Sequence, residues 1–396
     1  MEARDGGLLM DPVSRRRFLQ RSGAALAGAF LAACGVRQSS GTSVGTSPGS
    51  STTAGGGGIP AEIRIGVYAG DQAMVQRNIW VPAIEEQFGT TVLFDDSTTT
   101  AKSLATLEAE ADDPQHTILM LENPGARRAA LDGYLQPFDL SQMPNLSSSA
   151  PPWALYEDDH ALAFALNYMG PLTNAELGLP EISSYQDLLH PEFEGKVVIP
   201  SMSLIAGVYL LILGGLSEMG EAIPAGAESF DAEGAVEAGW GYLEKLKPQL
   251  HSIDTQVLPA FQLLGAGEIG VYAPSYSRYI APYRSEGTDM RVAFPSEGTF
   301  LAYNTLTIVK GGPAMDQASA MADLILGEDF QVGNAEAAAV GPVNTDVTLS
   351  EELQENYVPA AGDLPENAFP QGILNWEFIA ENHADWIDRF DAEIAL

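Results

Sequence analysis

"IRIGVYAGDQAMVQRNIWVPAIEEQFGTTVLFDD", residues 63–96, contains two short apolar runs separated by a segment with apolar residues at helical spacing. The first run ends at Gly70, and Asp71 stands where the N-cap of the following helix is expected. A glycine ends that helical segment, and the second apolar run follows directly. Strand, helix and strand in this order are typical of a parallel βαβ unit. The stretch predicts an α/β fold whose folded part begins near Ile59.

The same alternation of apolar runs and helical periods continues along the chain. Beyond the opening unit we expect strands at 116–123, 161–170, 196–200, 251–254, 268–274, 290–295 and 300–311, the last two joined as neighbours by SEGT. We expect helices at 100–113, 126–134, after residue 203, and at 233–246, 257–267, 315–327 and 375–396. This order predicts mostly parallel sheet covered by helices on both faces. The 396 residues suffice for two domains.

The charge of the chain excludes several classes of partner. It carries 19 Lys and Arg residues against 53 Asp and Glu residues, a formal net charge of −34. Such a surface repels nucleic-acid phosphates and anionic lipid headgroups, so we expect no nucleic-acid partner and no binding to membranes through basic patches. Cys34 is the single cysteine, which excludes intramolecular disulfides and metal sites built from several cysteines.

The segment that ends at Cys34 has the layout of an export signal. SRRRFLQ, residues 14–20, is followed by an apolar run over residues 23–33, which is too short to span a bilayer. SRRRFLQ resembles the twin-arginine export motif, and LAAC, residues 31–34, resembles the lipobox in which the cysteine is acylated. We therefore expect a twin-arginine lipoprotein signal peptide over residues 1–33 and a lipid on Cys34.

Residues 34–58 consist largely of Gly, Ser and Thr. A segment of this composition buries too little apolar surface to offset its ordering entropy, so we expect a flexible tether. Together with acylated Cys34, it would hold the folded part at the outer face of the cell membrane, extracellular or periplasmic, with the lipid as its only contact with the bilayer.

Motifs of catalysis are missing from the sequence. It contains no G-x-S-x-G, no H-E-x-x-H and no P-loop lysine, and its histidines stand singly without the spacing of metal ligands. We expect no enzyme, no cofactor and no metal site.

Four blocks of the sequence carry a family resemblance. LTNAELGLPEISSYQDLLHPEFEGKVVIPSMS (172–203), the segment 242–283 and FPSEGTFLAYNTLTIVKGGP (294–313), followed by AVGPVN (339–344), resemble extracellular solute-binding proteins of ABC importers. They most resemble the spermidine/putrescine-type branch, and the similarity extends over residues 63–396. Such proteins are commonly tethered lipoproteins, which agrees with the N-terminal segment.

The resemblance implies a two-lobed periplasmic-binding-protein-like fold with a central mixed sheet in each lobe and a hinge cleft. Lobe one would contain residues 59–165 and 297–330, and lobe two residues 166–296 and 331–396. It also implies a monomer that captures a small solute between the lobes and delivers it to the permease and ATPase subunits of an importer. Ligands of open α/β sheets bind beyond the carboxyl ends of strands, which locates the cleft independently.

Side chains at these strand ends and at the return crossing between the lobes are the candidate ligand-binding residues. They are Tyr68, Asp71 and Glu122 in lobe one, Ser203, Asp254, Thr255, Tyr276 and Arg278 in lobe two, and Glu297 and Tyr303 at the return crossing. Each also has a structural interpretation: Asp71 and Asp254 as helix N-caps, and the tyrosines as core residues with a hydrogen-bonded hydroxyl.

Two opposite charge patterns compete for the ligand. Carboxylates and aromatic faces suit a polyamine or related cationic amine, whereas Arg278 and helix N-termini suit a small anion such as a carboxylate or phosphonate. A ferric ion on Tyr276 and Tyr279, or a lipoprotein enzyme on the same fold, are further alternatives. The polyamine branch often has tryptophan in the cleft loop that here reads Pro274-Ser275-Tyr276. We expect a polyamine or related cationic amine.

Overall fold

The computed structural model describes residues 58–395. The predicted signal peptide, Cys34 and all of the predicted tether except its last residue lie outside the described residues. Within residues 58–395, no helix is long and apolar enough to cross a membrane.

One continuous path of hydrogen-bonded strands runs through the described chain, in the order β2-β1-β3-β11-β6-β9-β7-β8. On the N-terminal side, β1 (Glu62–Tyr68) pairs in parallel with β2 (Thr91–Thr98) and β3 (Ile118–Met120). On the other side, β7 (Val197–Pro200) pairs in parallel with β8 (Leu250–Asp254) and β9 (Val271–Tyr276). The expected α/β class with parallel strands is confirmed.

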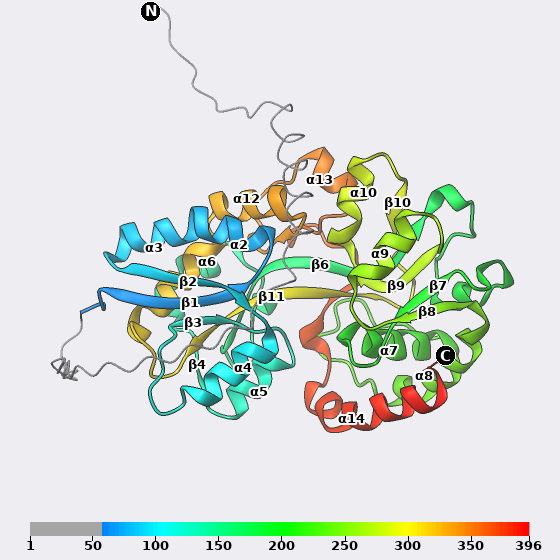
Figure 1. The fold of residues 1–396 in the computed structure, drawn as a ribbon, viewed down its shortest axis with the longest axis horizontal. Coiled ribbons are helices and arrows are strands. Elements are labelled where there is room, and N and C mark those ends of the chain that lie inside the picture. Colours follow the sequence, from blue (N-terminus) through cyan, green and yellow to red (C-terminus); the bar gives the residue numbers. More distant parts are fainter. Residues whose placement is uncertain (1–57, 396) are drawn as a thin grey trace, which may run out of the picture. The chain divides into compact units, whose positions relative to one another are not determined.

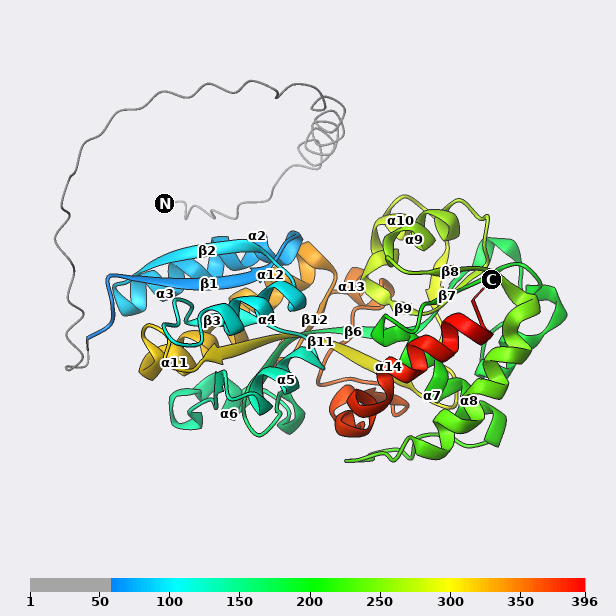
Figure 2. The same ribbon diagram turned by 60° about the horizontal axis from the view of Figure 1, so that its bottom comes forward.

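Two long antiparallel strands join these halves. β6 (Ala161–Asn174) pairs with β9 and with β11 (Thr299–Val309), which in turn pairs with β3. Both views show β6 and β11 running from one half into the other (Figure 1 and Figure 2). The result is a two-lobed arrangement with mixed sheet in each half, as the sequence predicts.

Short strands complete the sheet at its margins. They are β4 (Leu135–Gln136), β5 (Leu155–Tyr156), β10 (Met290–Val292), β12 (Gly341–Pro342) and β13 (Ala368–Pro370). The prediction that the strands at 290–295 and 300–311 are neighbours is wrong: β10 and β11 both pair with β6, not with each other. The long β6 presents enough backbone to pair with both.

The predicted helix after β1 is interrupted. It consists of α2 (Asp71–Val75), a π-helical turn (Gln76–Trp80) and α3 (Val81–Phe88), which ends at Gly89 with φ 64°. The turn puts Trp80 into the core, where its indole N–H donates to the backbone oxygen of Met321 at 2.7 Å. Asp71 is not the N-cap of this helix, because that position is Gly70 and no side chain caps it.

Helices cover both faces of the sheet. In the first half they are α4 (Thr100–Ala109), α5 (Gly125–Leu131), α6 (Pro144–Ser149), α11 (Ala318–Asp323) and α12 (Glu328–Ala338). In the second half they are α7 (Ile205–Met219), α8 (Glu233–Leu246), α9 (Leu258–Gly265), α10 (Ala281–Ser285) and α14 (Trp376–Glu393), and α13 (Glu351–Glu355) lies between the halves (Figure 1). The predicted helix at 315–327 forms only as α11 flanked by two 3-10 turns.

Strand β3 shows how the two faces are separated. Ile118 and Met120 pack into the cluster under α2 and α3, whereas Leu119 and Leu121 pack into the cluster under α4 and α5. The alternation follows from the two-residue period of a strand. It places the residue that follows, Glu122, at the edge where the carboxyl ends of β1 and β3 meet.

Helix α12 crosses the predicted boundary between lobe one, which would end at residue 330, and lobe two, which would resume at residue 331. Gln331 donates to the backbone oxygen of Phe164 at 2.9 Å, and Phe330 packs edge-on against the Phe164 ring at 6.2 Å. The helix also contacts α2 and the π-helical turn. The lobe ranges stay a prediction, and from these contacts we propose that lobe one extends through Ala338.

Candidate functional site

A cavity of about 500 Å³ lies where the carboxyl ends of the parallel strands face one another across the two crossing strands. Its first-half wall is the end of β1 with the loop after it, and Met120 and Glu122 at the end of β3. Its second-half wall is the 3-10 turn Ser277–Ile280 with α10. The end of α12 and part of α13 form its rim, and Asn304 of β11 lies between the walls. The cavity lies where the resemblance predicts a cleft between the lobes, and we call it the cleft.

Four of the ten candidate residues line this cleft together: Tyr68, Asp71, Glu122 and Arg278. Tyr276, the last residue of β9, is next to them, since its ring meets that of Tyr279 edge-on at 6.0 Å and Tyr279 lines the cleft. Asp71 is exposed at the rim, whereas Glu122 and Arg278 are half-buried.

No described residue donates a hydrogen bond to the carboxylate of Glu122. Its backbone N–H donates to the Tyr68 hydroxyl at 3.0 Å, but its carboxylate accepts no hydrogen bond from any described residue. Burial raises the pKa of Glu122 above its ordinary value of 4.5, and the positive charge of Arg278 opposes that rise. Partial burial of a carboxylate that receives no hydrogen bond from the protein is unfavourable, and a cation beside it would offset that cost.

Tyrosines surround Glu122. The Tyr68 hydroxyl is 2.6 Å from Thr100 Oγ1, and the Tyr156 hydroxyl is 2.6 Å from Thr305 Oγ1. Burial raises the pKa of both Tyr68 and Tyr276, and the negative charge of Glu122 raises them further. Because the pKa of each phenol lies above its ordinary value, both are neutral near pH 7.

Arg278 is held by an aromatic residue rather than by an acid. Its Nη2 donates to the Tyr279 hydroxyl at 2.7 Å, and its Cζ lies 4.6 Å from the centroid of the Tyr279 ring. Its Nε is buried and has no partner among the described residues. The guanidinium is thus positioned at the cleft without its charge being neutralised.

Glu297 and Asp254 lie away from the cleft and their oxygens are occupied. Glu297 is 4% exposed and accepts from the Ser184 hydroxyl and from the backbone N–H of Tyr185 at 3.2 Å. Asp254 accepts from the backbone N–H of Gln256 at 3.0 Å and from the Tyr272 hydroxyl at 3.1 Å. It is not an N-cap, because Val257 occupies that position of α9.

The remaining candidates also do not line the cleft. Ser203 and Thr255 are exposed, and Ser203 Oγ lies 3.0 Å from Ser201 Oγ. Tyr303 is buried and stacked on Trp153 with ring centroids 5.2 Å apart, and its hydroxyl has no partner among the described residues. Binding roles for these residues stay predictions.

Sequence reasoning missed several residues that line the cleft. Asn304 is a polar residue in an otherwise largely apolar buried strand, and it accepts from Gln72 Nε2 at 3.0 Å in the interior. That break in the apolar pattern of β11 is a signal that could have found it. Glu336 and Glu352 at the rim carry no such signal, since helices from distant parts of the chain bring them there.

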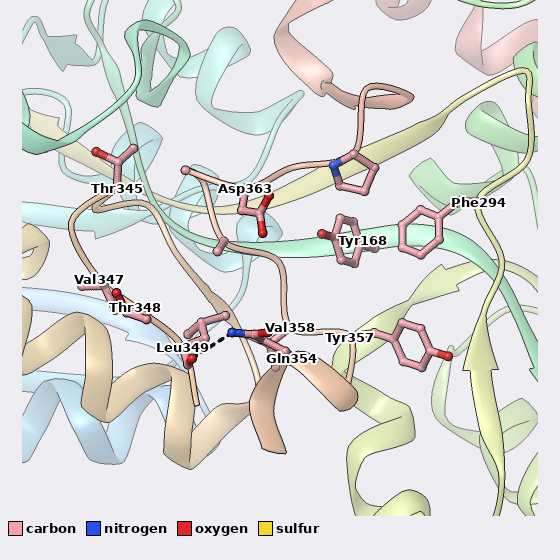
Figure 3. A pocket seen from close by; sticks show the side chains of 13 residues that line it. Tyr168, Phe294, Thr345, Val347, Thr348, Leu349, Gln354, Tyr357, Val358 and Asp363 are labelled. Carbon is pink, nitrogen blue, oxygen red and sulfur yellow. Dashed lines mark hydrogen bonds between the residues drawn. The ribbon is translucent and has the colours of Figure 1, made fainter. Parts of the chain in front are cut away.

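A second cavity, of about 440 Å³, lies beside the crossing strand β6 (Figure 3). Tyr168 of β6 and Phe294 meet edge-on at 4.9 Å on one side, and the segment 345–365 closes the other. Gln354 donates to the backbone oxygen of Leu349 at 3.0 Å within it. Burial, with a contribution from the charge of Asp363, raises the pKa of Tyr168 to about 12. Asp363 is exposed and is the one charged residue of its lining. We call this the hinge-side cavity.

Residues 80–360 match the family described as bacterial extracellular solute-binding protein. The chain belongs to this family. Its members bind solutes outside the cell, which agrees with the absence of catalytic motifs from the sequence. Within residues 58–395, no group of three or more His, Cys, Asp or Glu side chains is arranged to hold a metal ion.

The curated relative and the two solved structures described next share 13–24% of their residues with this chain. A periplasmic protein of Salmonella typhimurium that is named as 2-aminoethylphosphonate-binding is 24% identical over 278 residues, 68% of this chain and 72% of its own. An ABC transporter structure from Clostridium perfringens has a TM-score of 0.69 at 21% identity, over 84% of this chain and 99% of its own. A spermidine/putrescine ABC transporter substrate-binding protein from Streptococcus pneumoniae has a TM-score of 0.64 at 13% identity, over 85% and 100%. At these identities the structures establish the two-lobed fold, and the spermidine/putrescine branch stays a prediction.

Proposed function

We propose that this solute-binding protein is the receptor of an ABC importer and that it captures a small amine in the cleft that contains Glu122. The observation that carries the amine is the half-buried Glu122 carboxylate without a hydrogen-bond donor. An ammonium group supplies both the donors and the opposite charge, and each partner of such a desolvated pair compensates the other.

The surroundings of Glu122 favour a cation further. Asp71, Glu336 and Glu352 stand exposed at the rim, where their summed field attracts cations to the opening. Tyr68 lines the same space, and a cation over an aromatic face gains about 0.5–2 kcal/mol. The Tyr279 ring is already covered by the Arg278 guanidinium.

Capture proceeds by closure of the two halves about the crossing strands. β6 and β11 are the long connections between the halves, and hinge closure over a bound ligand is a common motion of two-lobed binding proteins. Closure would bring the Glu122 wall and the Arg278 wall together around the solute, and the closed form would then be delivered to the permease and ATPase subunits.

Relatives support an amine without selecting one. The Streptococcus pneumoniae protein is named for spermidine and putrescine and the Salmonella typhimurium protein for 2-aminoethylphosphonate, and all three compounds carry an ammonium group at neutral pH. A polyamine, the class predicted from the sequence, is therefore one candidate, and an amine that also carries an anionic group is the other.

We also propose that Cys34 is acylated and that residues 34–58 tether a monomer to the outer face of the membrane. The supporting observation is the twin-arginine motif and lipobox around the single cysteine. Cys34→Ser should then move the exported protein from the membrane fraction to the soluble fraction, and unchanged membrane association would contradict the anchor.

The test of the amine is a melting experiment on the purified protein with putrescine, spermidine and 2-aminoethylphosphonate. A ligand at a hundredfold excess over its Kd adds about 2.7 kcal/mol of stability, so at least one amine should raise the melting temperature. Glu122→Gln should remove that rise, and the matched control Glu366→Gln, at an exposed position, should keep it. The proposal fails if no amine raises the melting temperature or if Glu122→Gln retains the rise.

A further inference from the structure

Arg278 differs from the other basic residues of residues 58–395. Most of those residues pair with acids, as Arg127 does with Glu157 at 3.0 Å. The ones that form no ion pair with a described residue, apart from Arg278, are exposed: Arg64, Lys196 and Lys310. Arg278 is half-buried, in a chain with a large excess of acids, and still has no acidic partner. A half-buried charge without a partner is costly, so its position needs another explanation.

The aromatic wall behind Arg278 fixes its guanidinium in place. Tyr279 accepts from Nη2 at 2.7 Å and lies under the guanidinium, and its own ring packs against Phe261 at 5.0 Å and against Tyr276 at 6.0 Å. A neutral phenol orients the guanidinium but does not neutralise it. A guanidinium stacked on an aromatic ring and short of acceptors is a good receptor for an oxyanion.

Glu122 and Arg278 form a complementary pair of sites in one cleft. Both line it, and burial raises the pKa of Glu122 while the charge of Arg278 partly offsets that rise. They do not form an ion pair with each other, so neither charge is satisfied by direct contact. The two half-buried charges that line the cleft therefore sum to zero, with the negative one on the first half and the positive one on the second.

We propose, resting on the function proposed above, that the solute is a small zwitterion whose ammonium group binds Glu122 and whose oxyanion binds Arg278. One molecule with both groups satisfies both sites and links the two halves as they close. A carboxylate and a phosphonate share the required chemistry, since both present a fork of oxygens to a guanidinium.

A polyamine fits this cleft less well. One ammonium would be held by Glu122, but the next would approach Arg278, a like charge in surroundings where water screens little. The rim acids do not change this balance, because Asp71, Glu336 and Glu352 are exposed and solvent weakens their pairing. They attract cationic groups to the opening without adding a second ammonium site at depth.

The test is calorimetry and melting of the purified protein with matched probes. These are 4-aminobutanoate and 2-aminoethylphosphonate as zwitterions, putrescine as a dication, butylamine as an ammonium alone and butanoate as an oxyanion alone. We expect a zwitterion to bind tightest. Arg278→Gln should weaken its binding at least about 30-fold, the equivalent of about 2 kcal/mol, and should leave butylamine binding within about twofold. The matched control Arg291→Gln, which alters an exposed pair with Asp289, should bind all probes as the unaltered protein does.

The outcomes separate this inference from the function on which it rests. If putrescine binds tighter than both zwitterions, or if Arg278→Gln leaves zwitterion binding unchanged, the zwitterion is wrong while the amine receptor stands. If no probe binds, or butanoate alone binds, both fail. Arg278→Lys covers the case in which the glutamine variant does not fold: it keeps the charge but loses the fork, so zwitterion binding should weaken while butylamine binding does not.

Discussion

The cleft and the hinge-side cavity have similar volumes, about 500 and 440 Å³, but different linings. The cleft contains a carboxylate and a guanidinium that are half-buried and unpaired within the described chain. The hinge-side cavity contains Asp363, which is exposed, and neutral side chains. Volume does not distinguish the two. Unsatisfied charge does, because a chain keeps a half-buried charge without a partner only at a cost in stability.

The largest expected effect comes from the same chemical change made in each cavity. Glu122→Gln should weaken binding of the preferred amine by about 2–5 kcal/mol, as removal of one partner of a buried charge pair does. Asp363→Asn in the hinge-side cavity should change it by less than about 0.5 kcal/mol. Isothermal titration of both variants measures the difference, and equal losses would mean that the two cavities are not functionally distinct.

Glu297 can be compared with Glu122, because its carboxylate already accepts hydrogen bonds from within the fold. Glu297→Gln should lower the free energy of unfolding by about 2 kcal/mol, because the Ser184 hydroxyl and the Tyr185 N–H lose a charged acceptor. Amine affinity should not change. Denaturant unfolding measures the change in stability, and titration of the same preparation measures amine affinity. A loss of affinity without a loss of stability would mean that Glu297 binds the ligand.

Protonation of Glu122 should make amine affinity depend on pH, and the direction follows from its raised pKa. Its pKa in the folded protein is raised above 4.5, so the carboxylate becomes protonated as the pH falls from neutrality toward that value. Amine affinity should then drop about tenfold per pH unit below the folded pKa. Binding to Glu122→Gln should be weaker and flat over the same range. Titrations at a series of pH values test this, and a flat profile for the unaltered protein would show that Glu122 does not bind the ammonium.

The smallest expected effect is on the free energy of unfolding of the protein without ligand. Because the raised pKa makes the folded state hold the Glu122 proton more tightly than the unfolded chain, this stabilising contribution is present at low pH and is lost as the pH rises through the folded pKa. At neutral pH, Glu122→Gln should therefore raise the free energy of unfolding by about 1 kcal/mol. Asp363→Asn should not. A destabilised Glu122→Gln protein would mean that the carboxylate has a partner within the fold.

Much of the fold follows from local sequence patterns. The alternating apolar runs predict β1, β2 and the following α/β order because strand and helix periods act over a few residues. The interruption of the helix after β1 and the pairing of β10 were not predictable in this way. Trp80 donates to Met321 far along the chain, and β10 pairs with the end of β6, so both depend on contacts between distant segments.

The same distinction between local sequence patterns and contacts of distant segments applies to the candidate site. By itself the sequence determined that Tyr68, Glu122 and Arg278 lie at or just after the ends of strands, which in an α/β sheet is enough to bring them to one edge. The tertiary structure decided which charged candidates have free oxygens or nitrogens. Glu297 meets Ser184 across 113 positions, and Asp254 meets Tyr272 across 18, whereas the Glu122 carboxylate meets no donor in the described chain. Strand ends are set by periodicity over neighbouring residues, but hydrogen bonds to a carboxylate come from whatever the completed fold packs beside it.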